Sequence, residues 1–193
     1  MMIALTGFMG SGKTTVGKVL ADFLGCPFMD LDDLVVKKAG KSIPDIFAQD
    51  GEPAFRQLEA QVLRKTVEKY AESTAVLALG GGAVLAPASA ALLREKTVCI
   101  YLRATLETLL ARLAGETAGR PLLQEIPDQV GDDGGSVVMP GPDSSVMPGP
   151  DRASVSARLA SREPIYEETA HVIIDTDGLS PDEVADEIII SAL

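Results

Sequence analysis

The sequence has few of the side chains on which disulfide, redox and transition-metal chemistry depend. It contains no tryptophan, one histidine (His171) and two cysteines (Cys26 and Cys99). Two cysteines cannot build the disulfide scaffold of a small secreted protein, and a reducing cytoplasm suits them. Cys99 lies inside an apolar run and is expected in the core, and His171 has no cysteine or histidine partner in the sequence. We therefore expect neither a disulfide framework nor a histidine-based metal site.

Basic residues are also scarce. Lysine and arginine together number 17 against 28 acidic residues, which gives a formal net charge of −11. A general nucleic-acid binder or anionic-membrane binder needs the opposite sign, so both kinds of partner are disfavoured. Any site for an anionic ligand must gather its few cations at one place.

No apolar run suits an export signal or a membrane span. Met1–Leu5 is apolar but short, and it has no basic flank. Residues 75–93 carry no charge over 19 residues, but Gly80, Gly81 and Gly82 weaken any helix there. A strand, a turn and a short helix are the better prediction for this stretch. We expect a soluble cytoplasmic protein.

What the sequence does contain is an alternation of apolar strands and amphipathic helices. This alternation predicts an α/β protein with a central five-stranded parallel sheet and helices on both faces. The expected strands are Met2–Thr6, Pro27–Leu31, Ala75–Leu79, Val98–Leu102 and His171–Asp175. The expected helices are Lys13–Leu24, Ser42–Gln49, Pro53–Tyr70 and Pro181–Ala192.

One segment interrupts the alternation. Residues 131–150 contain nine glycines or prolines, which disfavours regular structure. Within it SVVMPGPD (136–143) is followed by SSVMPGPD (144–151), and two copies are too few for a solenoid. A duplication that lengthens a mobile loop is the favoured interpretation, and a docking segment that uses Met139 and Met147 is the alternative.

Gly7 to Thr14 reads GFMGSGKT and matches the phosphate-binding pattern G-x-x-x-x-G-K-[ST], between an expected strand and an expected helix. The glycines let successive N–H groups point at phosphate oxygens, and the start of the helix adds its dipole. Lys13 is expected to reach the β- and γ-phosphates, and the Thr14 hydroxyl to bind Mg²⁺. The residues expected to bind ATP here are Gly10, Ser11, Gly12, Lys13, Thr14 and Thr15.

The rest of the sequence narrows the kind of nucleotide enzyme. No N-K-x-D guanine motif is present, and the letters D-x-x-G at Asp132–Gly135 lie in the irregular segment. A GTPase is therefore disfavoured, and a large motor ATPase needs a longer chain. A small-molecule kinase fits the length.

Two carboxylates follow the second expected strand. Because ligands of open α/β sheets bind beyond the carboxyl ends of the strands, Asp30 and Asp32 are expected at the active edge. In an extended strand these two side chains point to the same side. We expect one to lie near Mg²⁺ and the other to accept or orient the acceptor hydroxyl proton. Capping of a following helix by Asp32 or Asp33 is the alternative.

These features, in this order, resemble the shikimate kinase family. The resemblance covers residues 1–123 and about 150–192, which leaves out only the irregular segment. Besides the phosphate loop, Asp30 and Asp32, it depends on Asp50–Arg56 (DGEPAFR) with Glu59, Gly80–Gly82, Arg112, Gly119–Leu123 (GRPLL) and Arg162–Glu167 (REPIYE). It implies a P-loop kinase fold of three layers with a mobile lid. It also implies transfer of the γ-phosphoryl group of ATP to the 3-hydroxyl of shikimate, in aromatic amino acid and chorismate biosynthesis.

The resemblance implies roles on the acceptor side. Asp32 would hold the acceptor hydroxyl as base or orienter, and Asp30 would lie near magnesium. Arg56 and Arg162 would grip the substrate carboxylate, for which the planar arginine fork is suited. Gly80–Gly82 would let the backbone contact the substrate ring and its hydroxyls, because three glycines exceed what a turn needs.

On the nucleotide side the resemblance implies that Arg112 and Pro181 flank the adenine and that Arg120 closes over the phosphates. Arg120 would lie in a lid of about residues 115–152, and the repeat insert of about 131–151 would protrude from this lid. Residues 1–193 would then form a single domain. Lys13, Mg²⁺ and Arg120 would neutralise the transferring phosphoryl group.

Other functions stay open at this point. A related kinase for gluconate or a nucleoside monophosphate is the nearest enzyme, and the carboxylate-binding arginines favour a hydroxylated acid over a nucleotide. A nucleotide-binding module without catalytic activity, acting through the proline-rich repeat, belongs to a different class. No feature implies an obligate protein partner, and a monomer suits an enzyme with a moving lid.

Overall fold

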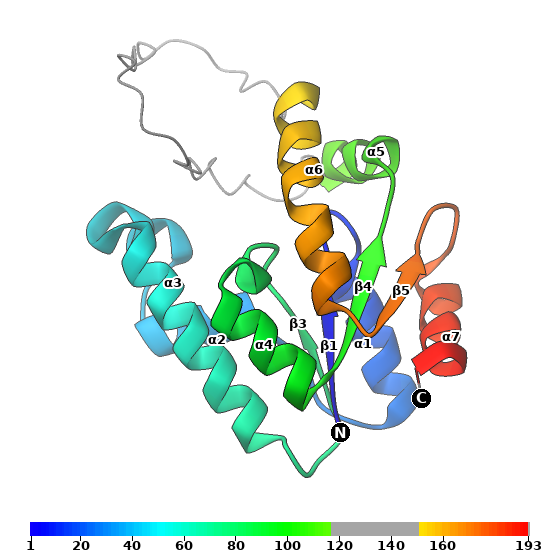
Figure 1. Ribbon diagram of the computed structural model, residues 1–193, viewed down its shortest axis with the longest axis horizontal. Helices are drawn as coiled ribbons and strands as arrows, with labels where there is room; N and C mark the ends of the chain where they lie inside the picture. Colours follow the sequence, from blue (N-terminus) through cyan, green and yellow to red (C-terminus); the bar gives the residue numbers. More distant parts are fainter. Residues whose placement is uncertain (117–150, 193) are drawn as a thin grey trace.

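The computed structural model describes residues 1–116 and 151–192, and its centre is a five-stranded parallel sheet (Figure 1). The strand order is β2-β3-β1-β4-β5, so the first strand lies in the middle. Neighbouring strands are parallel throughout, for example β1 with β3 and with β4. The strands are β1 (Met2–Thr6), β2 (Phe28–Asp30), β3 (Ala75–Ala78), β4 (Val98–Arg103) and β5 (Val172–Asp175).

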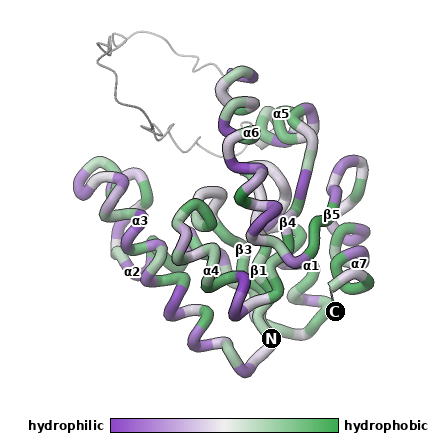
Figure 2. Tube along the Cα trace, viewed as in Figure 1, coloured by the Kyte–Doolittle hydropathy of each residue, from purple (hydrophilic) through white to green (hydrophobic). Residues whose placement is uncertain are grey.

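Helices cover both faces of the sheet, which gives the three layers expected from the sequence. The helices are α1 (Lys13–Leu24), α2 (Leu31–Ala39), α3 (Ile43–Lys69), α4 (Pro87–Lys96), α5 (Leu106–Glu116), α6 (Arg152–Thr169), α7 (Pro181–Ala192) and the 3₁₀ turn η1 (Ala83–Leu85). One hydrophobic core packs α1 and α7 against one face of the sheet. A second core packs the helices from α2 through α6 against the opposite face. The strands are coloured mostly hydrophobic in Figure 2, as expected for a sheet buried on both faces.

The second expected strand is shorter than predicted. β2 ends at Asp30, and Leu31 begins α2 instead of extending the strand. The Asp30 carboxylate accepts a hydrogen bond from the Asp32 N–H at 3.1 Å, so Asp30 is the N-cap of α2. The prediction that Asp30 and Asp32 share one side of a strand is therefore wrong, and so is the alternative of a cap at Asp32 or Asp33. Leu31, the first residue of this helix, is fully buried, which accounts for an apolar residue at this position without a strand.

The helices expected at Ser42–Gln49 and Pro53–Tyr70 form one kinked element, α3. The kink is at Gly51, whose φ of 80° is open to glycine and strained for other residues. Ser42 caps the start of α3 by accepting from the Asp45 N–H. Lys41 donates to the side chains of Gln49 and Asp50 just before the kink. Beyond the kink, the second half of α3 contributes Phe55, Val62, Leu63 and Val67 to the core on one face of the sheet.

Most of the predicted lid, including the repeat insert and Arg120, lies outside the described residues. The two described elements beside it, α5 and α6, are joined by a hydrogen-bonded ion pair between Glu107 and Arg152. None of the helices within residues 1–116 and 151–192 has both the length and the apolar character needed to cross a bilayer.

Candidate active site

The phosphate loop connects β1 to α1 and lies at the carboxyl edge of the sheet (Figure 1). Gly12 precedes α1 with a φ of 91°, and a Cβ at Gly7 would come within 2.7 Å of the Leu102 carbonyl oxygen. These two positions therefore require glycine. The Lys13 ammonium donates to the carbonyl oxygens of Gly7 at 2.9 Å and Phe8 at 2.8 Å, so it lies over the loop. The loop has the shape and positive charge of an anion site.

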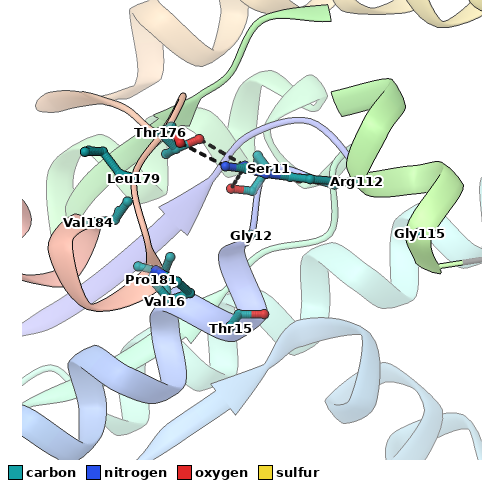
Figure 3. A pocket seen from close by; sticks show the side chains of 11 residues that line it. Ser11, Gly12, Thr15, Val16, Arg112, Gly115, Thr176, Leu179, Pro181 and Val184 are labelled. Carbon is teal, nitrogen blue, oxygen red and sulfur yellow. Dashed lines mark hydrogen bonds between the residues drawn. The ribbon is translucent and has the colours of Figure 1, made fainter. Parts of the chain in front are cut away.

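A pocket of about 330 Å³ opens beside this loop, between α5 and the start of α7 (Figure 3). Arg112 crosses one side of it and donates to the Thr176 carbonyl oxygen at 2.8 Å and the Thr176 hydroxyl at 3.1 Å. Thr176 belongs to none of the sequence motifs and was not predicted as a site residue. The lining brings together most of the predicted ATP-binding positions: Gly10, Ser11, Gly12, Thr15, Arg112 and Pro181.

Thr14 and Asp30 meet at the mouth of the loop. The Thr14 hydroxyl donates to Asp30 Oδ2 at 2.9 Å, while Asp30 Oδ1 accepts from the Asp32 N–H. A hydroxyl and a carboxylate beside a phosphate loop match the oxygen ligands of Mg²⁺, which is held by one or two carboxylates with substrate phosphates and water. Among the described residues no three acidic, histidine or cysteine side chains form a metal cluster of their own.

Asp32 lies in the first turn of α2 and faces the triple glycine. A Cβ at Gly80 would lie 2.8 Å from Asp32 Oδ1. The pKa of Asp32 is raised to about 6, first by burial and next by the neighbouring Asp30, against the opposing effect of Lys13 and Arg56. Asp32 is therefore a partly buried carboxylate with the properties of a proton acceptor near neutral pH.

Arg56 projects from α3 toward the same glycines. Its Nε donates to Glu52 at 3.2 Å and its Nη1 to Glu59 at 3.0 Å, and a Cβ at Gly82 would lie 2.6 Å from Nη1. Burial alone would lower the pKa of Arg56, but the two carboxylates outweigh burial and raise it. Nη2 donates no hydrogen bond within the part of the chain that the structure describes, so this nitrogen can donate to a ligand.

Glu59 is a site residue that sequence analysis left without a role. Its side chain is buried, and burial raises its pKa even though Arg56 acts in the opposite direction. The sequence does carry a signal for this pair: Glu59 follows Arg56 by three residues on an expected helix, and residues three or four apart share a helix face. By accepting the hydrogen bond from Nη1, Glu59 holds the Arg56 guanidinium in place.

The triple glycine follows β3 and leads into η1. None of Gly80, Gly81 and Gly82 has a positive φ, so a special backbone conformation does not explain them. Lack of space explains two of them, because Asp32 and Glu59 lie against Gly80 and Arg56 lies against Gly82, whereas a Cβ at Gly81 would meet nothing closer than 3.7 Å. The protein's own side chains approach two of these glycines closely, and contact of the loop with a ligand stays a prediction.

The two remaining predicted arginines have different outcomes. Arg162 is on α6, with its guanidinium carbon 6.0 Å from the centre of the Phe8 ring in the phosphate loop. It thus reaches the site from a different element than Arg56 does. Arg120 lies outside the described residues.

Known proteins resemble this chain in sequence and in fold. The shikimate kinase family model matches residues 9–192. A shikimate kinase of Salinibacter ruber is 42% identical over 177 residues, which cover 92% of this chain and 78% of that protein. The Acinetobacter baumannii shikimate kinase in complex with shikimate has a TM-score of 0.75 at 32% identity, covering 97% of this chain and 90% of that chain. A shikimate kinase of Bacteroides thetaiotaomicron has a TM-score of 0.78 at 26% identity, covering 100% of this chain and 99% of that chain. The chain belongs to the shikimate kinase family.

Proposed function

We propose that this protein transfers the γ-phosphoryl group of ATP to the 3-hydroxyl of shikimate, giving shikimate 3-phosphate and ADP. The observation that carries the proposal is the meeting of Asp32, Arg56 and Gly80–Gly82 beside the phosphate loop. A carboxylate that orients a hydroxyl, next to an arginine fork, suits a hydroxylated carboxylic acid. Family membership and the shikimate bound to the Acinetobacter baumannii protein favour shikimate as that acid.

On the nucleotide side, the loop from Gly10 to Thr15 would surround the phosphates. Lys13 would place its charge on the β- and γ-phosphates, as in other P-loop enzymes. Arg112 and Pro181, on opposite sides of the pocket, would hold the adenine between them. Three segments far apart in the sequence thus contribute to one nucleotide site.

On the acceptor side, phosphoryl transfer needs alignment and charge neutralisation more than covalent chemistry. Asp32 would accept a hydrogen bond from the acceptor hydroxyl and take its proton as the phosphoryl group arrives. Arg56 and Arg162 would hold the carboxylate, and together they fix the ring between two arginines on different helices.

Magnesium fits the residues at the mouth of the loop, where Thr14 and Asp30 supply oxygen atoms. When bound, it would neutralise charge on the phosphate oxygens. We further propose that the chain is one catalytic domain with a lid of about residues 115–152, and that Arg120 closes over the phosphates. A monomer is sufficient for this function, since every proposed role falls on one chain.

The test is ADP release from ATP and Mg²⁺ with shikimate, gluconate or AMP as the acceptor. Release with shikimate alone is the expected result, and release with gluconate or AMP instead would overturn the choice of acceptor. Asp32→Asn should abolish release while nucleotide binding persists. A module that only binds nucleotide would release no ADP with any acceptor, with or without this substitution.

A further inference from the structure

The triple-glycine loop is held by a tyrosine hydroxyl to which the proposed mechanism gives no task. Tyr166 of α6 is fully buried and donates a hydrogen bond to the Gly81 carbonyl oxygen at 2.5 Å. Its ring packs against Tyr101 of β4, with centroids 5.2 Å apart. A buried tyrosine ring with a single well-placed hydroxyl is a rigid anchor.

This hydrogen bond sets the direction of one peptide group. The described residues contain no cis peptide bond, so the Gly82 N–H points opposite to the Gly81 carbonyl. With the carbonyl directed at Tyr166, the N–H faces away from that hydroxyl. Glycine has the widest conformational freedom of any residue, so three in a row need an external contact to keep one orientation.

The surroundings of the loop connect it to the acceptor site. Gly82 lies against the Arg56 guanidinium, and Gly81 lies against the phosphate loop at the Met9 N–H. Tyr166 is four residues after Arg162, and residues with that spacing share a face of a helix. Helix α6 therefore both carries a proposed substrate arginine and holds the loop on which the substrate ring would rest.

We propose that Tyr166 is a positioning residue for the acceptor: its hydroxyl holds the Gly81–Gly82 peptide in the orientation that receives the hydroxyls of the acceptor ring. This inference rests on the proposed shikimate kinase activity. It assigns Tyr166 to acceptor binding and not to nucleotide binding, because the bond is made to the glycine loop and not to the pocket beside α7.

The chain offers a matched control. Tyr101 is equally buried and belongs to the same ring pair, but its hydroxyl has no hydrogen-bond partner among the described residues. Tyr166→Phe and Tyr101→Phe each remove one hydroxyl and keep the ring. One neutral hydrogen bond corresponds to roughly a three- to tenfold change in an equilibrium constant. We expect Tyr166→Phe to raise the KM for shikimate by about that factor, with the KM for ATP unchanged, while Tyr101→Phe matches the wild type.

An unchanged KM for shikimate in Tyr166→Phe, or an equal rise in Tyr101→Phe, would overturn the inference. A purely structural role would lower the Tm and leave both KM values of the folded enzyme unchanged. If the wild type does not phosphorylate shikimate, the proposed function itself fails. Amide hydrogen exchange at residues 80–83 then decides the positioning role: faster exchange in Tyr166→Phe alone supports it, and equal exchange in both variants rejects it.

Discussion

Asp32 is a carboxylate that the folded protein keeps charged at a cost in stability. Its pKa is raised to about 6, mainly by burial and next by Asp30. The substitution Asp32→Asn removes the negative charge of this side chain and nearly preserves its shape. We expect the variant to unfold at higher denaturant concentration than the wild type near neutral pH, in the absence of ligands, and to lose turnover. A residue that lowers stability while serving catalysis is a known trade-off in enzymes.

The sign and size of the effect follow from the two pKa values of Asp32. In the unfolded chain the pKa is 3.8 and in the folded protein about 6, so folding disfavours the charged form. The penalty is absent below pH 3.8, grows as the pH rises toward 6 and is complete above 6. A difference of about two pH units corresponds to about 3 kcal/mol, which is an upper bound because the carboxylate keeps some contact with solvent.

Urea unfolding of the wild type and Asp32→Asn at about pH 7.5 and about pH 5 measures this directly. The stability gap between the two proteins should shrink to roughly half at the lower pH. Asp33→Asn is the matched control, because Asp33 is exposed in the same helical turn. It makes the same charge change without relieving burial, so any gain in stability should be much smaller than that of Asp32→Asn. No gain for Asp32→Asn at pH 7.5, or a gap independent of pH, would refute this account of Asp32.

Three further predictions concern the acceptor side. Gly82→Ala places a methyl group 2.6 Å from the Arg56 guanidinium, so steady-state kinetics should give a KM for shikimate raised by roughly tenfold with little change for ATP. Glu59→Gln removes the charged partner of Arg56 Nη1 and should weaken shikimate binding in calorimetry; because burial raises the pKa of Glu59 despite Arg56, urea titrations should show no loss of stability. Because Asp32 must be ionised to accept a proton, kcat/KM should fall as the pH drops below about 6; a profile flat to pH 5 would contradict this role.

The phosphate loop could be predicted from the sequence because its signal is local. The glycines, Lys13 and Thr14 are contiguous, and the strand and helix on either side are read from their own periodicity. The pocket residue Thr176 could not be predicted in this way. It reaches Arg112 across 64 positions of sequence through a contact that only the assembled sheet creates.

Asp32 shows the limit of periodicity over short stretches. The sequence from Phe28 to Asp32 fits a continuous strand as well as it fits a strand followed by a helix, because Leu31 is an apolar residue between two acids. A single hydrogen bond from the Asp32 N–H to the Asp30 carboxylate ends the strand and begins a helix. The functional role expected for Asp32 did not depend on the strand, since a first-turn residue lies at the same edge of the sheet.

The three glycines show a different limit. Three consecutive glycines indicated that there is no room for side chains at Gly80–Gly82, but the sequence could not indicate which neighbouring groups take up that space. At Gly80 and Gly82 the side chains that would clash are those of Asp32, Glu59 and Arg56, which come from two helices earlier in the chain. Contacts of this kind depend on how helices pack, and pattern alone does not specify packing.

The placement of Arg112 and Thr176 has a consequence for the order in which the site is made during synthesis. The arginine donates to Ser11 across 101 positions and to Thr176 across 64, and α7 closes the pocket from residue 181 onward. A ribosome-bound chain that already displays the phosphate loop therefore lacks the pocket proposed for adenine until the fifth strand and last helix have emerged. Since domains fold as units during translation, ATP can stabilise only chains that are nearly finished, and truncated chains gain no protection from it.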